Sequence, residues 1–498
     1  MDALAFEHHL TSPQGRGRLP RGGVSASAGG ARCCDQIQIA LAVRGGRVAE
    51  AGFTASGCGA ATAAGSAAVT LVRGAPVLHA ARVGADEIAE ELGGLSPAKR
   101  HAAELAAEAL ARALGLAVRG AAECLPPAGG RERTLVAMSG GVDSAVAALL
   151  CARAGEAVAV TLELWADPEN DGERSCCSAS AVAQARRLAH EMGLPHLTLD
   201  LRAEFRAGVV EPFMAAYAAG ETPNPCVGCN GHVRLDAMLA LADRLGCATL
   251  ATGHYARTAE DEHPDGPLLR AAADPAKDQT YMLAALEPDS LRRLRFPLGE
   301  LTKPWVRELA AQAGLPVARR ADSQDLCFLA GTDRARFLAR HGRLGERRGE
   351  VVDTGGRVLG EHRGQHRFTV GQRRGLGVSA TEPLYVLDRD PATNRVTVGP
   401  RRELLAREVW IRGARLHRPG DRVDRVKLRY RSRPLRARLD PAIAAGRHRS
   451  LRIELPEHPA EGAAPGQLAC LMDGELVVGW GTIARRPAPA GRAAASGP

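Results

Sequence analysis

The residues with the clearest chemistry form the run Ser-Gly-Gly-Val-Asp-Ser at positions 139–144. The run follows an apolar segment typical of a strand and precedes an alanine-rich segment, 145–154, typical of a helix. Small residues and free backbone N–H groups at the N-terminus of a helix form a site for phosphate. A Walker loop, which acts on a γ-phosphate, would need Gly-Lys-Ser or Gly-Lys-Thr, and the run has no such lysine. We therefore predict a phosphate-binding loop of another type; the alternative is an ordinary glycine-rich turn.

Three thiols form a second group with chemical potential. Cys226 and Cys229 lie in the run 222–230, where two prolines fix an extended backbone before a predicted helix. The dipole of a helix favours a thiolate near its N-terminus, and the thiolate is the nucleophile. Polar residues surround Cys327 in the run 320–328, which argues against a plain core cysteine. Sulfur transfer needs two facing thiols, one that carries a persulfide and one that resolves it as a disulfide. The alternative, a zinc site at Cys226 and Cys229, lacks a second ligand pair nearby.

Three further polar runs follow in the sequence. Residues 251–256 end a predicted strand, at the edge where sites of α/β proteins form. Residues 277–281 form a polar loop that opens a helix, and residues 368–377 form a basic, glycine-rich turn suited to phosphate contacts.

Composition limits the class of protein. The net charge is +9, and residues 401–452 alone hold 17 Lys and Arg against 5 Asp and Glu, which indicates a polyanionic partner; the alternative is a solvated basic surface. No apolar stretch is long enough to span a membrane, and the N-terminus lacks an apolar signal core. We therefore expect no membrane partner and a cytoplasmic location, where the 12 cysteines are reduced and serve catalysis, metal binding or packing.

The elements that must position these residues fall into distinct segments. Strands are expected at 134–138, 157–162, 196–200 and 248–252, and helices at 144–154, 178–192, 204–218 and 231–245. This alternation predicts a parallel α/β sheet. From about residue 331 short strands with turns predict small β domains. The expected segments are a disordered N-terminus (1–30), a small α+β domain (31–120), a linker (121–130), the α/β domain (131–330), two β domains (331–399 and 400–485, the second a barrel) and a disordered tail (486–498).

Together these runs resemble one enzyme family. The loop at 139–144 resembles the PP-loop of ATP pyrophosphatases, which belong to the adenine nucleotide alpha hydrolase-like fold. All the runs, together with residues 296–303, occur in the order found in tRNA-specific 2-thiouridylases, the MnmA family. The resemblance covers residues 131 to about 485 and implies that ATP drives exchange of the C2 oxygen for sulfur on the wobble uridine, in the anticodon region of tRNA.

The resemblance also implies roles for individual residues. Cys229 is expected to be the nucleophile, Cys327 the persulfide carrier, and Asp143 a further catalytic residue. The residues expected to bind ATP are Ala137, Met138, Ser139, Gly140, Gly141, Val142, Asp143, Ser144, Leu162 and Gly253. The residues expected to contact tRNA are Asn224, Pro225, Cys226, His254, Lys277, Asp278, Gln279, Arg429, Tyr430 and Gln467. Mg²⁺ is expected with ATP on charge grounds, but the sequence shows no ligand set.

Cys226 is a departure from the family pattern, since many members have Asp at this position. The substitution leaves three thiols that meet at one site if Cys226, Cys229 and Cys327 are neighbours. Some related tRNA thiolation enzymes use three cysteines to hold an iron–sulfur cluster, so a cluster here stays open as a hypothesis.

The N-terminal segment resembles a different family, the IscU/NifU iron–sulfur scaffold. The resemblance rests on the runs at 33–37, 57–60 and 90–95 and on residues 99–101. It implies a metal site at Cys33, Asp35, Cys58 and His101, with Ala102 in place of a third ligand cysteine and Cys34 as a neighbouring thiol. Three interpretations stay open: a labile cluster or zinc site, a docking module for a cysteine desulfurase or sulfur relay protein, and a degenerate packing domain. A tethered sulfur source would raise its effective concentration at the thiolation site.

Two other functions stay open as well. The chain could be a different PP-loop adenylating ligase or synthetase, or an iron–sulfur carrier with a non-catalytic ATP domain. The pair Cys229 and Cys327 and the basic β region argue against the first, and the intact loop at 139–144 argues against the second.

Overall fold

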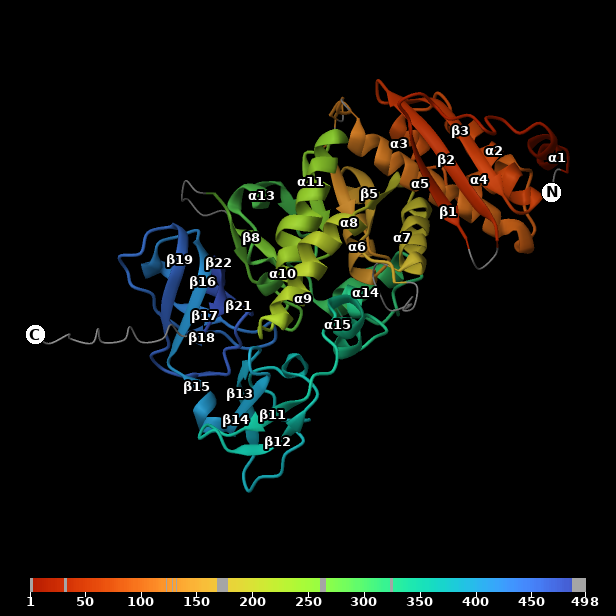
Figure 1. Cartoon of the computed structure of the whole chain (residues 1–498). Coiled ribbons are helices and arrows are strands. Elements are labelled where there is room, and N and C mark those ends of the chain that lie inside the picture. Colours follow the sequence, from red (N-terminus) through yellow and green to blue (C-terminus); the bar gives the residue numbers. More distant parts are fainter. Residues whose placement is uncertain are drawn as a thin grey trace, which may run out of the picture.

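The computed structural model describes residues 3–30, 34–121, 123–127, 129–130, 132–167, 178–259, 266–322 and 326–485. An N-terminal unit lies at one end, a parallel-sheet unit lies in the middle, and two β units lie on the far side of it (Figure 1). Among the helices in these ranges, none is long and apolar enough to cross a membrane. The tail predicted to be disordered, 486–498, lies outside the described residues.

The N-terminal unit is an antiparallel sheet, in the order β1-β2-β3, against which alanine-rich helices pack. Small residues allow close approach: a Cβ on Gly65 would lie 2.3 Å from the ring of Phe53. The elements of this unit are α1 (Ala3–Thr11), β1 (Val24–Gly29), β2 (Gln36–Arg44), β3 (Arg47–Ser56), α2 (Gly59–Val72), α3 (Val77–Ala80), α4 (Ala85–Glu91), η1 (Pro97–Lys99) and α5 (Arg100–Gly120).

The prediction that residues 1–30 are disordered is wrong for the described part, 3–30, which contains α1 and β1. Strand β1 pairs with β2 along its whole length. His9 of α1 is buried and lies 2.8 Å from the hydroxyl of Ser66. Both contacts join residues far apart in the sequence, so a short, glycine-rich segment gives no periodic signal of them.

The middle unit is a parallel sheet in the order β10-β7-β4-β5-β6, which confirms the predicted α/β class. Its strands are β4 (Arg133–Ala137), β5 (Glu156–Glu163), β6 (His196–Asp200), β7 (Thr249–Thr252) and β10 (Leu294–Arg295). Its helices are α6 (Val142–Ala154), α7 (Ala179–Glu191), α8 (Arg202–Phe205), η2 (Arg206–Val210), α9 (Glu211–Ala218), α10 (Pro225–Gly228), η3 (Cys229–Arg234), α11 (Leu235–Arg244), α12 (Thr280–Leu283), α13 (Pro288–Arg293), α14 (Lys303–Gln312) and η4 (Cys327–Leu329). Strands β4 and β7 pair so that Ala137 lies opposite Thr252, and the residues that follow them are therefore neighbours.

The last part of the described chain forms two larger β sheets, in the orders β12-β11-β14-β13 and β18-β17-β21-β22-β16-β19, and a two-stranded sheet of β15 and β20. The expectation of strands alone after residue 331 misses α15 (Arg334–Gly342). The larger sheet also takes in β8 (Arg257–Ala259) and β9 (Leu268–Arg270), because β9 pairs with β22. The remaining elements are β11 (Gly349–Val352), β12 (Val358–His362), η5 (Gln365–Arg367), β13 (Leu384–Asp390), β14 (Arg395–Pro400), η6 (Arg401–Leu404), β15 (Leu405–Ala406), β16 (Glu408–Leu416), η7 (Gly420–Arg422), β17 (Arg425–Lys427), β18 (Leu435–Arg436), β19 (Gly446–Glu454), β20 (Ala460–Glu461), β21 (Leu468–Asp473) and β22 (Leu476–Ala484).

Helix α5 of the N-terminal unit packs against β6, the edge strand of the parallel sheet. The approach is close at Gly115, where a Cβ would lie 2.0 Å from the carbonyl oxygen of Thr198. Arg112 of the same helix donates to Glu163 of β5 at 2.6 and 2.8 Å and to the carbonyl oxygen of Ser27 at 2.8 Å. A half-buried guanidinium paired with a buried carboxylate fixes the angle at which the two units meet.

Gly115→Ala is expected to lower the melting temperature by several degrees, because relieving the clash with Thr198 costs about 1–3 kcal/mol. Thermal unfolding of the full chain measures this. Gly120→Ala on the same helix is the matched control, since nothing lies within 4 Å of its Cβ position. The control is expected to leave the melting temperature unchanged or raise it, because alanine favours helix. Equal effects of the two substitutions would contradict a tight α5–β6 contact.

Candidate active site

The loop at 139–144 links β4 to α6 as the sequence predicts. Gly140 has φ +72°, a conformation that favours glycine. The hydroxyl of Ser144 accepts the backbone N–H of Ser139 at 3.1 Å, which holds the loop closed. Gly253, after β7, lies against this turn: a Cβ there would lie 2.8 Å from the backbone nitrogen of Ser144. The other residues expected to bind ATP surround the loop: Ala137 ends β4, Met138 follows it, Gly141 caps α6, Val142 begins α6, and Leu162 lies in β5.

Asp143, the acid of this loop, is held by two partners from distant segments. The phenol of Tyr255 donates to its carboxylate at 2.7 Å. The ammonium of Lys303 donates to both carboxylate oxygens, at 2.7 and 2.8 Å. Burial and the neighbouring carboxylate raise the pKa of Tyr255, so the phenol remains a hydrogen-bond donor.

Lys303 is a functional residue to which the sequence analysis gave no role. It begins helix α14, its side chain is only 9% exposed, and it also pairs with Asp322 at 2.8 Å. A lysine at the first position of a helix opposes the helix dipole, and a lysine buried there needs acidic partners. That unfavourable placement is the signal that could have identified it.

The three thiols meet at one cavity. Cys226, Cys229 and Cys327 line a cavity of about 1030 Å³, together with Asp143 of the phosphate loop. The cavity is also lined by most of the residues expected to contact tRNA: Pro225, His254, Lys277, Asp278, Gln279 and Tyr430. The structure therefore brings the predicted nucleotide site and the predicted sulfur site to one space.

Local structure explains how Cys226 and Cys229 reach this cavity. Asn224 caps α10, and its side chain accepts the backbone N–H of Cys226 at 3.2 Å. Cys229 lies one turn further along and opens η3, a stretch with the wider turn of a π-helix. Such stretches are frequent at functional sites because they rotate side chains out of the regular helical pattern. Cys229 is 6% exposed, so the surrounding protein shields its sulfur from bulk water.

The polar residues beside the thiols are themselves fixed. Desolvation lowers the pKa of His254 to about 3, so this imidazole is neutral at physiological pH. Asp278 accepts the ammonium of Lys427 at 3.2 Å, and Gln279 accepts the backbone N–H of Tyr255 at 2.9 Å. The first contact joins the 277–279 loop to Lys427 of the larger β sheet, and the second joins it to the chain that follows β7.

Three residues expected to contact tRNA lie behind the cavity and contact protein. Gln467 donates to the carbonyl oxygen of Thr222 at 2.7 Å, which supports the loop that carries Cys226. Asn224 acts as the helix cap described above. Arg429 donates to the carbonyl oxygen of Gly462 at 2.6 Å.

In the basic stretch 401–452, some side chains pair with acidic residues and some line the cavity. Arg401, Arg412 and Arg415 pair with Glu461, Glu221 and Glu287. Such pairs neutralise part of the positive charge that the sequence shows. This paired part of the stretch fits the alternative interpretation, a solvated surface. Residues that reach the cavity include Arg425, Lys427, Arg431 and Arg433. Lys427 and Arg425 also pair, with Asp278 and Asp424, so Arg431 and Arg433 are the cavity-lining cations of this stretch that we expect a polyanion to meet.

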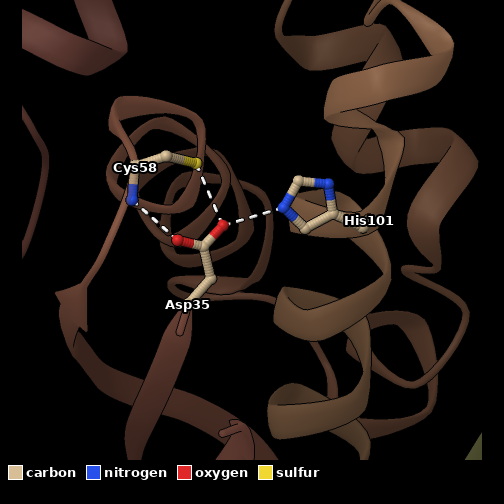
Figure 2. A group of neighbouring side chains, drawn as sticks. All are labelled: Asp35, Cys58 and His101. Carbon is tan, nitrogen blue, oxygen red and sulfur yellow. Dashed lines mark hydrogen bonds and ion pairs between the residues drawn. The ribbon is translucent and has the colours of Figure 1, made fainter. Parts of the chain in front are cut away.

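A separate cluster lies in the N-terminal unit (Figure 2). Asp35 accepts the backbone N–H of Cys58 at 2.7 Å and its thiol at 3.0 Å, and His101 Nε2 lies 2.8 Å from the same carboxylate. One potential ligand atom from each of these residues lies within 4.8 Å of the others. Hydrogen bonds from Cys58 and His101 lower the pKa of Asp35, and the bond to Asp35 raises the pKa of His101. Sulfur, nitrogen and carboxylate donors at this spacing suit Zn²⁺ or Fe²⁺.

The sequence also named Cys33, Cys34 and Ala102 at this site. Cys33 lies outside the described residues. Within the described part of the chain, Cys34 is exposed and is not among the three clustered ligands. Ala102 is fully buried and offers no ligand atom.

Comparison with known proteins matches each part of the chain to a family model. A NifU-like N terminal domain matches residues 5–117, a tRNA methyl transferase HUP domain matches 132–331, and a tRNA methyl transferase PRC-barrel domain matches 335–400. These matches agree with the N-terminal unit, the parallel-sheet unit and the smaller β sheet.

The curated relatives span either nearly the whole chain or about seven tenths of it. A bifunctional protein NifU/MnmA of Rubrobacter xylanophilus is 45% identical over 492 residues, which is 96% of this chain and 98% of the relative. A tRNA-specific 2-thiouridylase MnmA of Moorella thermoacetica is 42% identical over 70% of this chain and 98% of its own length, and one of Rhodospirillum rubrum is 44% identical over 69% and 92%. Both resemblances found in the sequence are thereby confirmed, and the chain belongs to the family of bifunctional NifU/MnmA proteins.

Proposed function

We propose that this chain is an ATP-dependent tRNA 2-thiouridylase that acts on the wobble uridine. The observation that carries the proposal is the single cavity lined by Asp143 of the phosphate loop, by three thiols and by basic side chains. A different PP-loop ligase would not need Cys229 and Cys327 to share this space, and a sulfur carrier would not need the phosphate loop. The relatives of Moorella thermoacetica and Rhodospirillum rubrum are named tRNA-specific 2-thiouridylases, which supports the proposal.

In the first step the loop at 139–144 holds the phosphates of ATP with backbone N–H groups. The O2 atom of the uridine attacks the α-phosphorus, and pyrophosphate leaves. Asp143 would hold a Mg²⁺ ion that would neutralise charge on the phosphates, and Lys303 beside it stabilises the charge that develops on the phosphate oxygens. The adenylated base is then a good electrophile at C2.

In the second step the terminal sulfur of a persulfide on Cys327 attacks C2, and AMP departs with the original oxygen. The thiolate of Cys229 attacks the Cys327 sulfur, which breaks the persulfide S–S bond and leaves a Cys229–Cys327 disulfide for a cellular thiol to reduce. Cys226 stands at the position of the Asp found in many relatives and meets the target base with Pro225, while Asn224 holds this turn as its cap. An iron–sulfur cluster on Cys226, Cys229 and Cys327 is the competing use of the same cavity.

Cys229→Ser and Cys327→Ser are each expected to abolish 2-thiouridine, because each removes one partner of the sulfur exchange. Mass spectrometry of nucleosides from unmodified tRNA incubated with ATP and a sulfur donor measures this. Cys151→Ser is the matched control, since burial raises the pKa of that thiol to about 11 and keeps it unreactive.

Cys226→Ser separates the two uses of the thiols. Persulfide chemistry predicts that this variant keeps activity and that the anaerobically purified enzyme is active without iron. Stoichiometric iron and sulfide, lost together with activity in all three variants, would instead establish the cluster. If the wild-type chain forms no 2-thiouridine, the proposed function is wrong.

Arg431→Ala and Arg433→Ala are expected to weaken tRNA binding and to reduce the slope of log affinity against log salt by about 1 each, because each removes one phosphate contact. Binding titrations across a range of salt concentrations measure the slope. Arg401→Ala, which breaks a pair with Glu461 on the surface, is the control and is expected to leave the slope unchanged. Equal slopes in all variants would show that tRNA does not approach this side of the cavity.

For the N-terminal unit we propose a metal or iron–sulfur site at Asp35, Cys58 and His101 that receives its cargo from a cysteine desulfurase or sulfur relay protein. The three side chains support this proposal. The carboxylate of Asp35 accepts hydrogen bonds from the Cys58 thiol and the His101 imidazole, so the ligand atoms already lie close together. A metal held there would take the thiolate of Cys58, the carboxylate of Asp35 and the imidazole of His101 as ligands.

Zn²⁺ titration of the full chain tests this site. Cys58→Ser and His101→Ala are expected to weaken binding by at least about 10-fold, whereas Cys124→Ser, an exposed thiol elsewhere, leaves it unchanged. A proton on His101 competes with the metal, and the pKa of His101 is raised, so affinity falls as pH is lowered through a value above 6.5. A Zn²⁺ affinity that changes neither in the two variants nor with pH would indicate that this unit is a packing domain without a metal site.

A further inference from the structure

The segment that carries Cys327 is fixed on its C-terminal side by aromatic packing. Phe328 is buried and lies with its ring 5.0 Å from that of Phe213 and 5.2 Å from that of Phe337, measured between ring centroids. Edge-on packing of this kind restricts both position and orientation. The sulfur of Cys327 is therefore attached to a rigid point on one side.

On its N-terminal side the segment is fixed by charge. The carboxylate of Asp322 meets three cations: Lys277 at 2.7 Å, Lys303 at 2.8 Å and Arg307 at 2.9 Å. Burial favours the neutral acid, but the bonds from Lys277 and Lys303 lower the pKa of Asp322 to about 2. A carboxylate with three cationic partners has far fewer positions open to it than one in a single surface pair.

The same cations connect Asp322 to the phosphate loop. Lys303 lies between the carboxylates of Asp143 and Asp322 and pairs with both. Just before Asp322, Arg320 donates to the carbonyl oxygen of Gly140 in the loop at 3.0 Å. Arg320 thus joins the phosphate loop directly, Asp322 joins it through Lys303, and Lys277 connects Asp322 to the tRNA side of the cavity.

We propose that Asp322 is a positioning residue for sulfur transfer, which sets the place of Cys327 relative to the phosphate loop through Lys303. The inference rests on the proposed function. Adenylation and sulfur attack act on the same base, so the persulfide must approach C2 while AMP is still bound beside the loop. Reacting atoms need to be held at near-contact distance, and a small misplacement from a distant change costs about 100-fold in rate.

The test separates the two half-reactions in the full chain with an unmodified tRNA transcript. Adenylation is the burst of pyrophosphate with ATP and tRNA in the absence of a sulfur donor. Sulfur transfer is single-turnover 2-thiouridine formation by enzyme preloaded with persulfide from polysulfide. Asp322→Asn is expected to slow sulfur transfer about 100-fold while changing the burst far less, because Lys303 keeps its partner Asp143.

Two further variants make the result specific. Asp322→Glu keeps the charge but moves it by one methylene, and it is expected to recover part of the sulfur-transfer rate, which a loss of folding would not allow. Asp289→Asn is the matched control, since this exposed acid pairs with Arg292 far along the sequence from the thiols, and both rates are expected to match the wild type.

Equal loss of both half-reactions in Asp322→Asn and Asp322→Glu, or no loss in either variant, would overturn the inference while leaving the proposed function standing. A wild-type chain with neither a pyrophosphate burst nor 2-thiouridine would overturn the proposed function itself, and the inference with it.

Discussion

The parallel pairing of β4 with β7 is the constraint on which the rest of the site depends. Parallel strands present their carboxyl ends at one edge of the sheet, and ligands of α/β proteins bind there. Because Ala137 lies opposite Thr252, the phosphate loop and Gly253 are pressed together, and Tyr255 two residues later reaches Asp143. A shift of this pairing by one residue would turn these side chains to the other face of the sheet.

A buried lysine adds the second constraint. Removing a charge from water is costly unless partners surround it, and Asp143 and Asp322 together stabilise Lys303 in its buried place. Such a pair is weak evidence for stability, since apolar residues could fill the same space. Its value is geometric: it admits one arrangement of the phosphate loop and the chain before Cys327, two segments that the sequence separates widely.

The difference between what could and could not be predicted from the sequence follows from distance along the chain. The phosphate loop and the Cys226–Cys229 run are contiguous, so residue type and spacing reveal their chemistry directly. Lys303 has a local sign, its place at the start of a helix, but its partners lie at distant positions, and β9 pairs with the distant β22. No local pattern identifies these partners. Strand β1 escaped prediction for the same reason, because only its partner β2 makes it a strand.

The packing of α5 on β6 holds the N-terminal unit in a fixed position relative to the parallel-sheet unit. Tethering raises effective concentration only where geometry lets both sites engage together. Here Arg112 and Gly115 lock the N-terminal unit to the sheet edge, and His101 faces a separate cavity of about 230 Å³ beside α7, while Cys327 lines the central one. With the units fixed in this way, a swing of Cys58 toward Cys327 would first have to break a buried ion pair and a close helix–strand contact. Direct transfer of sulfur from Cys58 to Cys327 within one chain would therefore require this interface to open.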